Sequence, residues 1–238
     1  MFKEKETDVL YRIRALRDFG CVKKGDVGGY IKKEENLSHE GVCWVFGNAR
    51  VYDNAHVFGD TRVYDNACVY GDARVFGDTH VYGNACVYDD ALIMDYVHVY
   101  GKARVYDNAR VYDNACVCDN ARVYDNACVY YHAQVFGNAH VYDNAHVFGD
   151  AHVFGNARVY DNACVYGDAL IMDYAHVYGN ALIYDNARVY GKARVYDNAC
   201  VYGKAHVYDN ACVYGKARVY DNACVYGKAH VYDNAQVS

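Results

Sequence analysis

Apolar residues recur along this chain with a period of six from Cys43 to Val237. The repeated phrase is Ala-x-Val-Tyr-(Gly/Asp)-(Asn/Asp/Lys), and Val or Ile occupies 33 consecutive stops from Val45 to Val237 without insertion or deletion. A helix turns about 100° per residue, so residues six apart point in three directions and form no apolar face. In a strand, the Ala and the Val two residues later share one face. The period therefore predicts short strands and excludes helices.

The two residues that follow each aromatic residue predict a corner. Gly or Asp, followed by Asn, Asp or Lys, tolerates the left-handed backbone conformation of turns. Three strands and three corners close a triangle, so the array predicts a parallel β-helix with 18 residues per coil and 11 coils. At about 4.8 Å per layer, such a rod is about 50 Å long.

Residues 1–42 differ in composition from the array and contain all five glutamates. Residues 11–15 alternate apolar and charged side chains, so this segment and residues 27–31 predict strands. Residues 32–36 predict a solvated loop. A solenoid needs a polar end-piece over its first coil. We therefore expect a capping segment at 1–42 and a repeat domain at 43–238.

Phrases of this N-terminal segment resemble those of a known family. They are Tyr-Arg-Ile-Arg-Ala-Leu-Arg-Asp-Phe at 11–19, Val-Lys-Lys-Gly-Asp-Val-Gly-Gly-Tyr-Ile at 22–31, Glu-Asn-Leu-Ser at 35–38 and Cys-Trp-Val at 43–45. Together with the array they resemble the YdcK-like β-solenoid proteins of bacteria and phages over essentially the whole chain. The resemblance implies a left-handed, all-β parallel β-helix with an N-terminal β-rich cap. Members are often labelled transferases because their fold looks like that of hexapeptide acyltransferases, but a shared fold does not establish an activity.

The composition of the chain limits the cellular compartments and the classes of partner that we expect. The net charge of −6 argues against a general nucleic-acid binder. No apolar run approaches the ~20 residues of a membrane span, and the first residues lack the apolar stretch of a signal peptide. Eleven cysteines without an export signal indicate free thiols in a reducing compartment. We therefore expect a cytoplasmic protein with no membrane contact.

Catalytic candidates are few. Serine occurs only at Ser38 and Ser238, which excludes a serine nucleophile within the array. The hexapeptide class uses a histidine base between subunits, and the best placed candidates here are His140, His146 and His152 in one coil. Nine histidines occupy the outward x position, which Arg, Cys, Leu and Gln also fill, so we favour solvated histidines on the β faces. The alternative is an acyltransferase that binds acetyl-CoA or another acyl-CoA and acts as a side-by-side trimer. We expect no metal and, outside this alternative, no cofactor.

Residues 18 apart are expected to stack in columns along the rod. We interpret a column of tyrosines as stabilising the rod through stacking of their rings between coils. The alternative is a surface on which carbohydrate or base ligands stack. Arg104, Arg122, Arg158 and Arg194 form one outward column, which predicts either a polyanion stripe or, as we prefer, a lattice neutralised by aspartates of the nearby corner. Cys68 and Cys86 are predicted neighbours in consecutive coils, and we favour free thiols over a disulfide. The tyrosines of the column are Tyr52, Tyr70, Tyr88, Tyr106, Tyr124, Tyr142, Tyr160, Tyr178, Tyr196, Tyr214 and Tyr232.

Two further features favour a structural function. Residues 86–96 recur almost intact at 164–174, an offset of 13 hexads, which places the copies on different sides of the rod. The last coil, 220–238, has no polar cap sequence, so Val231 and Val237 are expected to form a self-association edge. The sequence thus predicts a non-catalytic scaffold or interaction rod, with an end-to-end homodimer as its favoured assembly.

Overall fold

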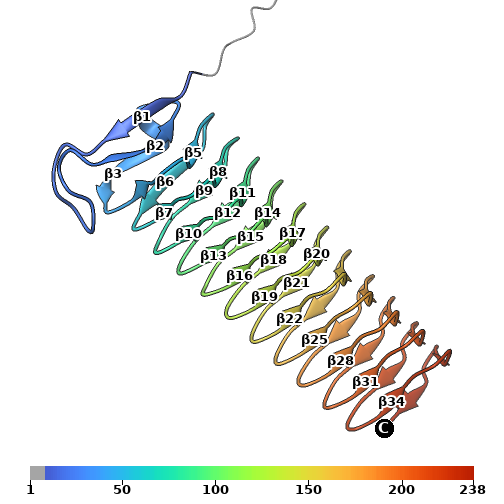
Figure 1. Cartoon of the computed structure of the whole chain (residues 1–238). Coiled ribbons are helices and arrows are strands. Elements are labelled where there is room, and N and C mark those ends of the chain that lie inside the picture. Colours follow the sequence, from blue (N-terminus) through green and yellow to red (C-terminus); the bar gives the residue numbers. More distant parts are fainter. Residues whose placement is uncertain (1–8) are drawn as a thin grey trace, which may run out of the picture.

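Each six-residue phrase folds into a short strand followed by a corner, and three phrases complete one turn of a rod (Figure 1). The structure is a computed structural model that describes residues 9–238. The expected fold class is confirmed: the chain is an all-β parallel β-helix with an 18-residue coil and an N-terminal β-rich cap. The only helical element among the described residues is the 3-10 turn η1 (Glu34–Asn36).

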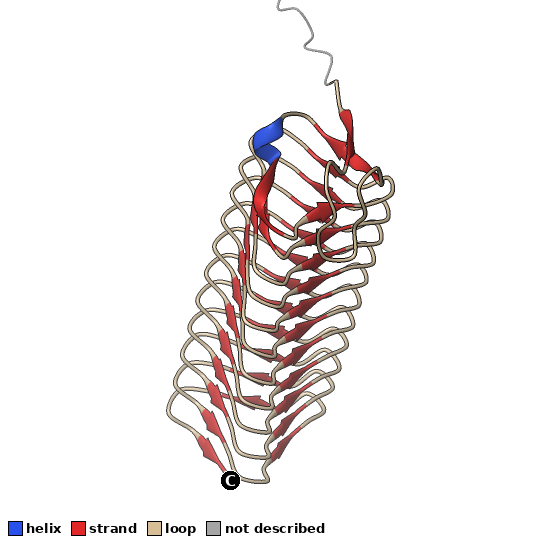
Figure 2. Cartoon of the chain, turned by 90° about the vertical axis from the view of Figure 1, so that its left-hand side faces the viewer, coloured by secondary structure: helices blue, strands red, loops and turns tan. Residues whose placement is uncertain are grey.

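Three sheets run along the rod, and each receives one strand from every coil (Figure 2). The first sheet contains β1 (Tyr11–Arg14), β2 (Val27–Ile31), β5 (Arg50–Val51), β8 (Cys68–Val69), β11 (Cys86–Val87), β14 (Arg104–Val105), β17 (Arg122–Val123), β20 (His140–Val141), β23 (Arg158–Val159), β26 (His176–Val177), β29 (Arg194–Val195), β32 (Cys212–Val213) and β35 (His230–Val231). The second contains β4 (Trp44–Val45), β7 (Arg62–Val63), β10 (His80–Val81), β13 (His98–Val99), β16 (Cys116–Val117), β19 (Gln134–Val135), β22 (His152–Val153), β25 (Leu170–Ile171), β28 (Arg188–Val189), β31 (His206–Val207) and β34 (Cys224–Val225). The third contains β3 (Leu37–Gly41), β6 (His56–Gly59), β9 (Arg74–Val75), β12 (Leu92–Ile93), β15 (Arg110–Val111), β18 (Cys128–Val129), β21 (His146–Val147), β24 (Cys164–Val165), β27 (Leu182–Ile183), β30 (Cys200–Val201), β33 (Arg218–Val219) and β36 (Gln236–Val237).

Strands of consecutive coils pair in parallel and in register, residue i with residue i+18. His80 pairs with His98, for example, and the Arg50 amide donates to the Ala67 carbonyl at 2.9 Å. The 33 strands from β4 to β36 make the 11 predicted coils. Strands β2 and β3 pair in parallel with β5 and β6, so part of the N-terminal segment adds to the same stack.

The core is a column of small aliphatic side chains. The Val or Ile and the Ala of nearly every phrase lose all contact with solvent, apart from those near the C-terminal end. Thr61 and Thr79 take the Ala position in two phrases, and their hydroxyls donate to the carbonyls of Phe58 and Phe76. The even period thus gives a continuous interior in which every coil presents nearly the same surface to the next.

Corners hold the left-handed backbone angles that the Gly/Asp alternation predicts. Asp corners have φ near +55°, as at Asp89, and Gly corners have φ near +70°, as at Gly71. A Cβ on Gly71 would lie 2.6 Å from the Asp89 amide nitrogen, so consecutive corners approach closely there. Outward aromatic rings beside the corners stack from coil to coil, and the predicted column from Tyr52 to Tyr232 is continuous, with ring centroids 4.8–5.5 Å apart.

The cap begins with β1, which pairs antiparallel with β2. Trp44 is buried against Phe19, with ring centroids 5.4 Å apart, and packs with Ala15 and Val22 in a small second core. The expectation of a fully solvated loop at 32–36 is wrong for Asn36, which has no exposed surface because its side chain bonds to the first coil. Strand β3 was not expected, since its sequence Leu-Ser-His-Glu-Gly does not alternate.

Candidate functional site

The three histidines proposed as catalytic candidates lie on three different sheets. His140 is in β20 of the first sheet, His146 in β21 of the third and His152 in β22 of the second. Each is half-buried and sets its ring edge-on against an aromatic ring of the preceding coil, 6.1–6.3 Å between centroids. A single chain therefore does not bring these side chains together.

His140 has the most distinctive electrostatic environment of the three. Its pKa is lowered from the usual value by burial and then by Arg122 and Arg158, its neighbours in the adjacent coils. A neutral imidazole is the form that accepts a proton. Burial and the two neighbouring guanidiniums thus account for the lowered pKa of His140.

The arginine column of the first sheet is continuous in the structure. Arg104 pairs with Arg122, and the column continues through His140, Arg158 and His176 to Arg194. All four arginines are exposed. Among residues 9–238, none of these arginines forms a direct ion pair with a carboxylate, so any neutralisation by the corner aspartates acts over a longer distance.

Aspartates form a ladder at the neighbouring corner. Asp89 and Asp107 occupy equivalent places in consecutive coils, and the pKa of Asp89 is raised by burial and then by the charge of Asp107. Elsewhere, corner aspartates bond to the next coil, as when Asp65 Oδ2 accepts the Gly83 amide at 3.1 Å. Within residues 9–238 no cluster of three or more His, Cys, Asp or Glu side chains is arranged to hold a metal ion. The corner carboxylates are accounted for as turn residues.

Two pairs of thiols stand out among the eleven cysteines, all of which are free. Cys68 and Cys86 pair in register in adjacent coils, as predicted, and their thiols donate to the carbonyls of Asn66 and Asn84. Cys116 and Cys118 lie two residues apart at the second sheet, and the neighbouring Cys118 thiol lowers the pKa of Cys116. These contacts were only partly foreseeable, because sequence spacing gives the register but not the direction of the thiols.

A cavity in the cap was missed by sequence reasoning. It has a volume of about 650 Å³ and lies between the cap and the first coil. Ile13, Phe19, Leu37 and Trp44 line it, together with polar residues that include Arg17, whose guanidinium donates to the His39 carbonyl. The one signal in the sequence is Trp44, the single tryptophan, at an outward position where the array carries smaller or polar residues.

The last coil differs from those before it in exposure. Val231 and Val237 are partly exposed, whereas equivalent valines upstream are fully buried. Tyr226 and Tyr232 expose half or more of their surface. The described residues contain no helix with the length and apolarity needed to cross a membrane.

Comparison with known proteins identifies the repeat. The family model described as the YdcK β solenoid repeat matches residues 67–83, 103–118, 181–195, 193–208 and 217–233. No curated protein matches the chain. Among 19 matching chains of solved structures is an Arabidopsis UDP-N-acetylglucosamine acyltransferase, at 13% identity and a TM-score of 0.24. The match covers 82% of this chain and 64% of that one, so this chain spans less than two thirds of that protein's length.

Proposed function

Because the chain is built of YdcK β-solenoid repeats, we propose that it works as a non-catalytic rod that scaffolds or spaces partner proteins. The observation that carries the proposal is the regularity of the array. Thirty-three strands follow one another with nearly the same buried residues, whereas the outward side chains vary much more. A surface selected for catalysis would keep particular outward residues together on one side.

The duplicated segment supports this interpretation. Cys86 lies in β11 of the first sheet, whereas its counterpart Cys164 lies in β24 of the third. Leu92 lies on the third sheet, and its counterpart Leu170 on the second. Copying the segment therefore moved its outward side chains to other faces while the core remained unchanged, which a rod tolerates and a constellation of catalytic residues does not.

Stacking makes the rod stiff. Every coil is bonded to the next through three strand pairs, and aromatic columns continue from coil to coil. Stacked aromatic pairs contribute about 0.5–1.5 kcal/mol each beyond burial. In repeat proteins such nearest-neighbour contacts add along the array. Stiffness over the full length is the property that a spacer needs. The free thiols suit a reducing compartment, so the proposal places the rod in the cytoplasm.

We further propose that this 238-residue chain associates through its last coil. The partly exposed Val231 and Val237 and the unpaired lower edges of β34, β35 and β36 offer strand pairing and apolar contact to a second copy. An end-to-end dimer would have about twice the length of one rod. Val237→Lys should raise its dissociation constant, whereas the matched change Gln236→Lys, at the adjacent outward position, should leave the dissociation constant nearly unchanged.

Sedimentation and small-angle scattering, combined with thermal shift, test both proposals. The rod hypothesis expects an elongated particle, a doubled maximum dimension at high concentration, and no saturable shift with acetyl-CoA or succinyl-CoA. A side-by-side trimer with a saturable acyl-CoA shift would overturn it in favour of an acyltransferase with a histidine base between subunits. A strict monomer at high micromolar concentration would refute the end-to-end contact and leave the monomeric rod.

A further inference from the structure

One column of the first sheet places two cysteines in consecutive coils. Cys68 in β8 pairs directly with Cys86 in β11. The other outward strand cysteines among the described residues pair only with His, Arg, Gln or Leu, as Cys128 pairs with Arg110 and His146. Cys68 and Cys86 are thus the only outward strand cysteines within residues 9–238 that are stacked in this way.

The backbone holds these two residues at a distance suited to a covalent link. Adjacent strands lie about 4.8 Å apart, and paired residues in register have a similar Cα separation. Disulfides span Cα separations of about 4.4–6.8 Å. Both side chains leave the same face of the sheet from paired positions, and each thiol donates to the carbonyl two residues before it, at 3.7 Å for Cys68 and 3.8 Å for Cys86. Both side chains are half-buried, which leaves them open to a small reagent.

Arginines flank the pair along the column. Arg50 pairs with Cys68 on one side, and Arg104 pairs with Cys86 on the other. The neighbouring Cys68 thiol, and after it the charge of Arg104, lower the pKa of Cys86 to about 7 against the opposing effect of burial. The pKa of Cys68 is raised, first by the neighbouring Cys86 thiol and then by burial. One thiolate therefore forms near neutral pH, between two cations.

We propose that Cys68 and Cys86 form a reactive dithiol that exchanges with low-molecular-weight disulfides and closes a reversible cross-link between consecutive coils. The Cys86 thiolate attacks one sulfur of the small disulfide, forms a mixed disulfide and releases one small thiolate. Cys68 then loses its proton to solvent and attacks the Cys86 sulfur, which expels the second small thiolate. The protein dithiol is oxidised by two electrons, and the small disulfide is reduced to two thiols.

Other cysteines of the chain provide internal comparisons. Burial raises the pKa of Cys128 and Cys164, which have no thiol neighbour. The Cys118 thiol lowers the pKa of Cys116, but the two residues lie two positions apart along one chain segment, about 6.6 Å between Cα atoms. That separation is near the upper limit for a disulfide. Cys116 is therefore expected to react with the reagent without closing a ring as readily.

Trypsin separates the relevant thiols. Cleavage after Arg and Lys gives peptides 63–74 and 75–102, which contain only Cys68 and only Cys86, and peptide 123–158, which contains only Cys128. The full chain is incubated at pH 7 with oxidised glutathione, quenched by alkylation and digested without reductant. We expect peptide 63–74 joined to peptide 75–102, with a mass two hydrogens below the sum of the free peptides, and loss of the link after treatment with reductant.

Alkylation rates give a second readout. At pH 7 a thiol of pKa near 7 is about half ionised, against about 1% at pKa 9, and its lower nucleophilicity offsets part of this gain, so Cys86 should react about fivefold or more faster than Cys128. Cys68→Ser should abolish the cross-link and leave glutathione on Cys86. The matched Cys128→Ser should leave the link intact. Two results with the wild-type chain alone would overturn the proposal. One is glutathione on Cys86 without the cross-link to Cys68, and the other is an equal alkylation rate at Cys86 and Cys128.

Discussion

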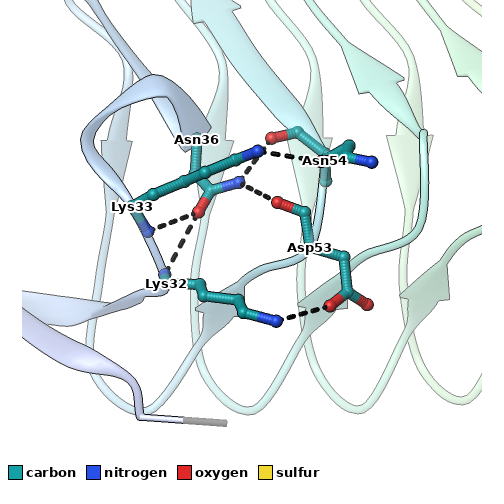
Figure 3. A network of polar contacts seen from close by, with 6 residues as sticks. Lys32, Lys33, Asn36, Asp53 and Asn54 are labelled. Atoms are coloured by element: carbon teal, nitrogen blue, oxygen red, sulfur yellow. Dashed lines mark hydrogen bonds and ion pairs between the residues drawn. The ribbon is translucent and has the colours of Figure 1, made fainter. Parts of the chain in front are cut away.

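Replacing Asn36 with Ala tests how the cap is attached to the first coil. The Asn36 side chain is fully buried and makes four hydrogen bonds (Figure 3). Its Oδ1 accepts the amides of Lys32 at 3.1 Å and Lys33 at 2.9 Å. Its Nδ2 donates to the carbonyls of Asp53 at 3.1 Å and Ala55 at 2.8 Å. One side chain thus joins the turn before β3 to the corner after β5.

The loss of stability expected from Asn36→Ala can be estimated from these contacts. A hydrogen bond contributes about 1 kcal/mol net, and a buried group left without its partner costs about 1–3 kcal/mol. Alanine removes four bonds, and of these the bond to Ala55 is fully buried while the others are partly buried. We expect a loss of about 3–5 kcal/mol. Because coils unfold locally in a repeat protein, this loss should be confined to the cap and the first coil.

Hydrogen exchange followed by mass spectrometry resolves that locality. A loss of about 4 kcal/mol corresponds to about a thousandfold faster exchange for amides that exchange through opening of the cap. Peptides covering residues 27–59 should show this change, whereas peptides from 130–219 should not. The matched control is Asn54→Ala, which removes an exposed side chain with one bond from Lys33 Nζ. Equal protection of 27–59 in the two variants would refute the role assigned to Asn36.

Three further predictions concern the corners, the tyrosines and the histidines. Gly71→Ala should destabilise the protein by about 1–2 kcal/mol more than Gly47→Ala, as measured by thermal unfolding. Both glycines have positive φ, but an added Cβ would lie 2.6 Å from the Asp89 amide nitrogen at Gly71 and 3.6 Å from the Asp65 carbonyl oxygen at Gly47. Equal costs would contradict the close approach of consecutive corners at Gly71. Burial raises the pKa of six tyrosines from 10 to about 12, so their contribution to stability is complete below pH 10 and lost toward pH 12. Tyrosine ionisation, followed by absorbance at 295 nm, and unfolding, followed by circular dichroism, should therefore occur together in this range. Separate transitions would refute the linkage. The pKa values of His140 and His176 are lowered from 6.5, so their contribution to stability is present above pH 6.5 and lost below it. Replacing both with Gln should therefore make the free energy of unfolding depend less on pH between pH 7 and 5. An unchanged slope in the double variant would contradict this prediction. The six tyrosines are Tyr52, Tyr70, Tyr88, Tyr124, Tyr130 and Tyr184.

The repeat could be predicted almost completely from the sequence. A period of six without a gap fixes which residues face inward, and three phrases per coil fix the register of every pair, because i and i+18 have no other way to align. The stacking of Tyr52 on Tyr70 and the pairing of Cys68 with Cys86 follow from this arithmetic. The dispersal of His140, His146 and His152 over three sheets follows from it as well.

The candidate sites depended more on contacts that spacing does not encode. Register places Arg104 near a corner that carries aspartates, but the direction of two long side chains decides whether they meet, and in the structure they form no ion pair. Register likewise brings two thiols to one column, but the direction of each thiol depends on its side-chain rotamer. The cap cavity required Trp44 and Phe19, which lie 25 residues apart in an aperiodic segment.

The sequence by itself determined the rod, because its contacts repeat one local rule along the chain. The tertiary structure decided the cap, where no period operates and each contact is made once. Asn36 lies in a charged hydrophilic stretch whose composition predicts solvent exposure, yet it is buried because backbone amides and carbonyls of two segments need a partner at that point. Such a requirement arises only when the two segments meet in space. For that reason no local sequence pattern predicts the burial of Asn36.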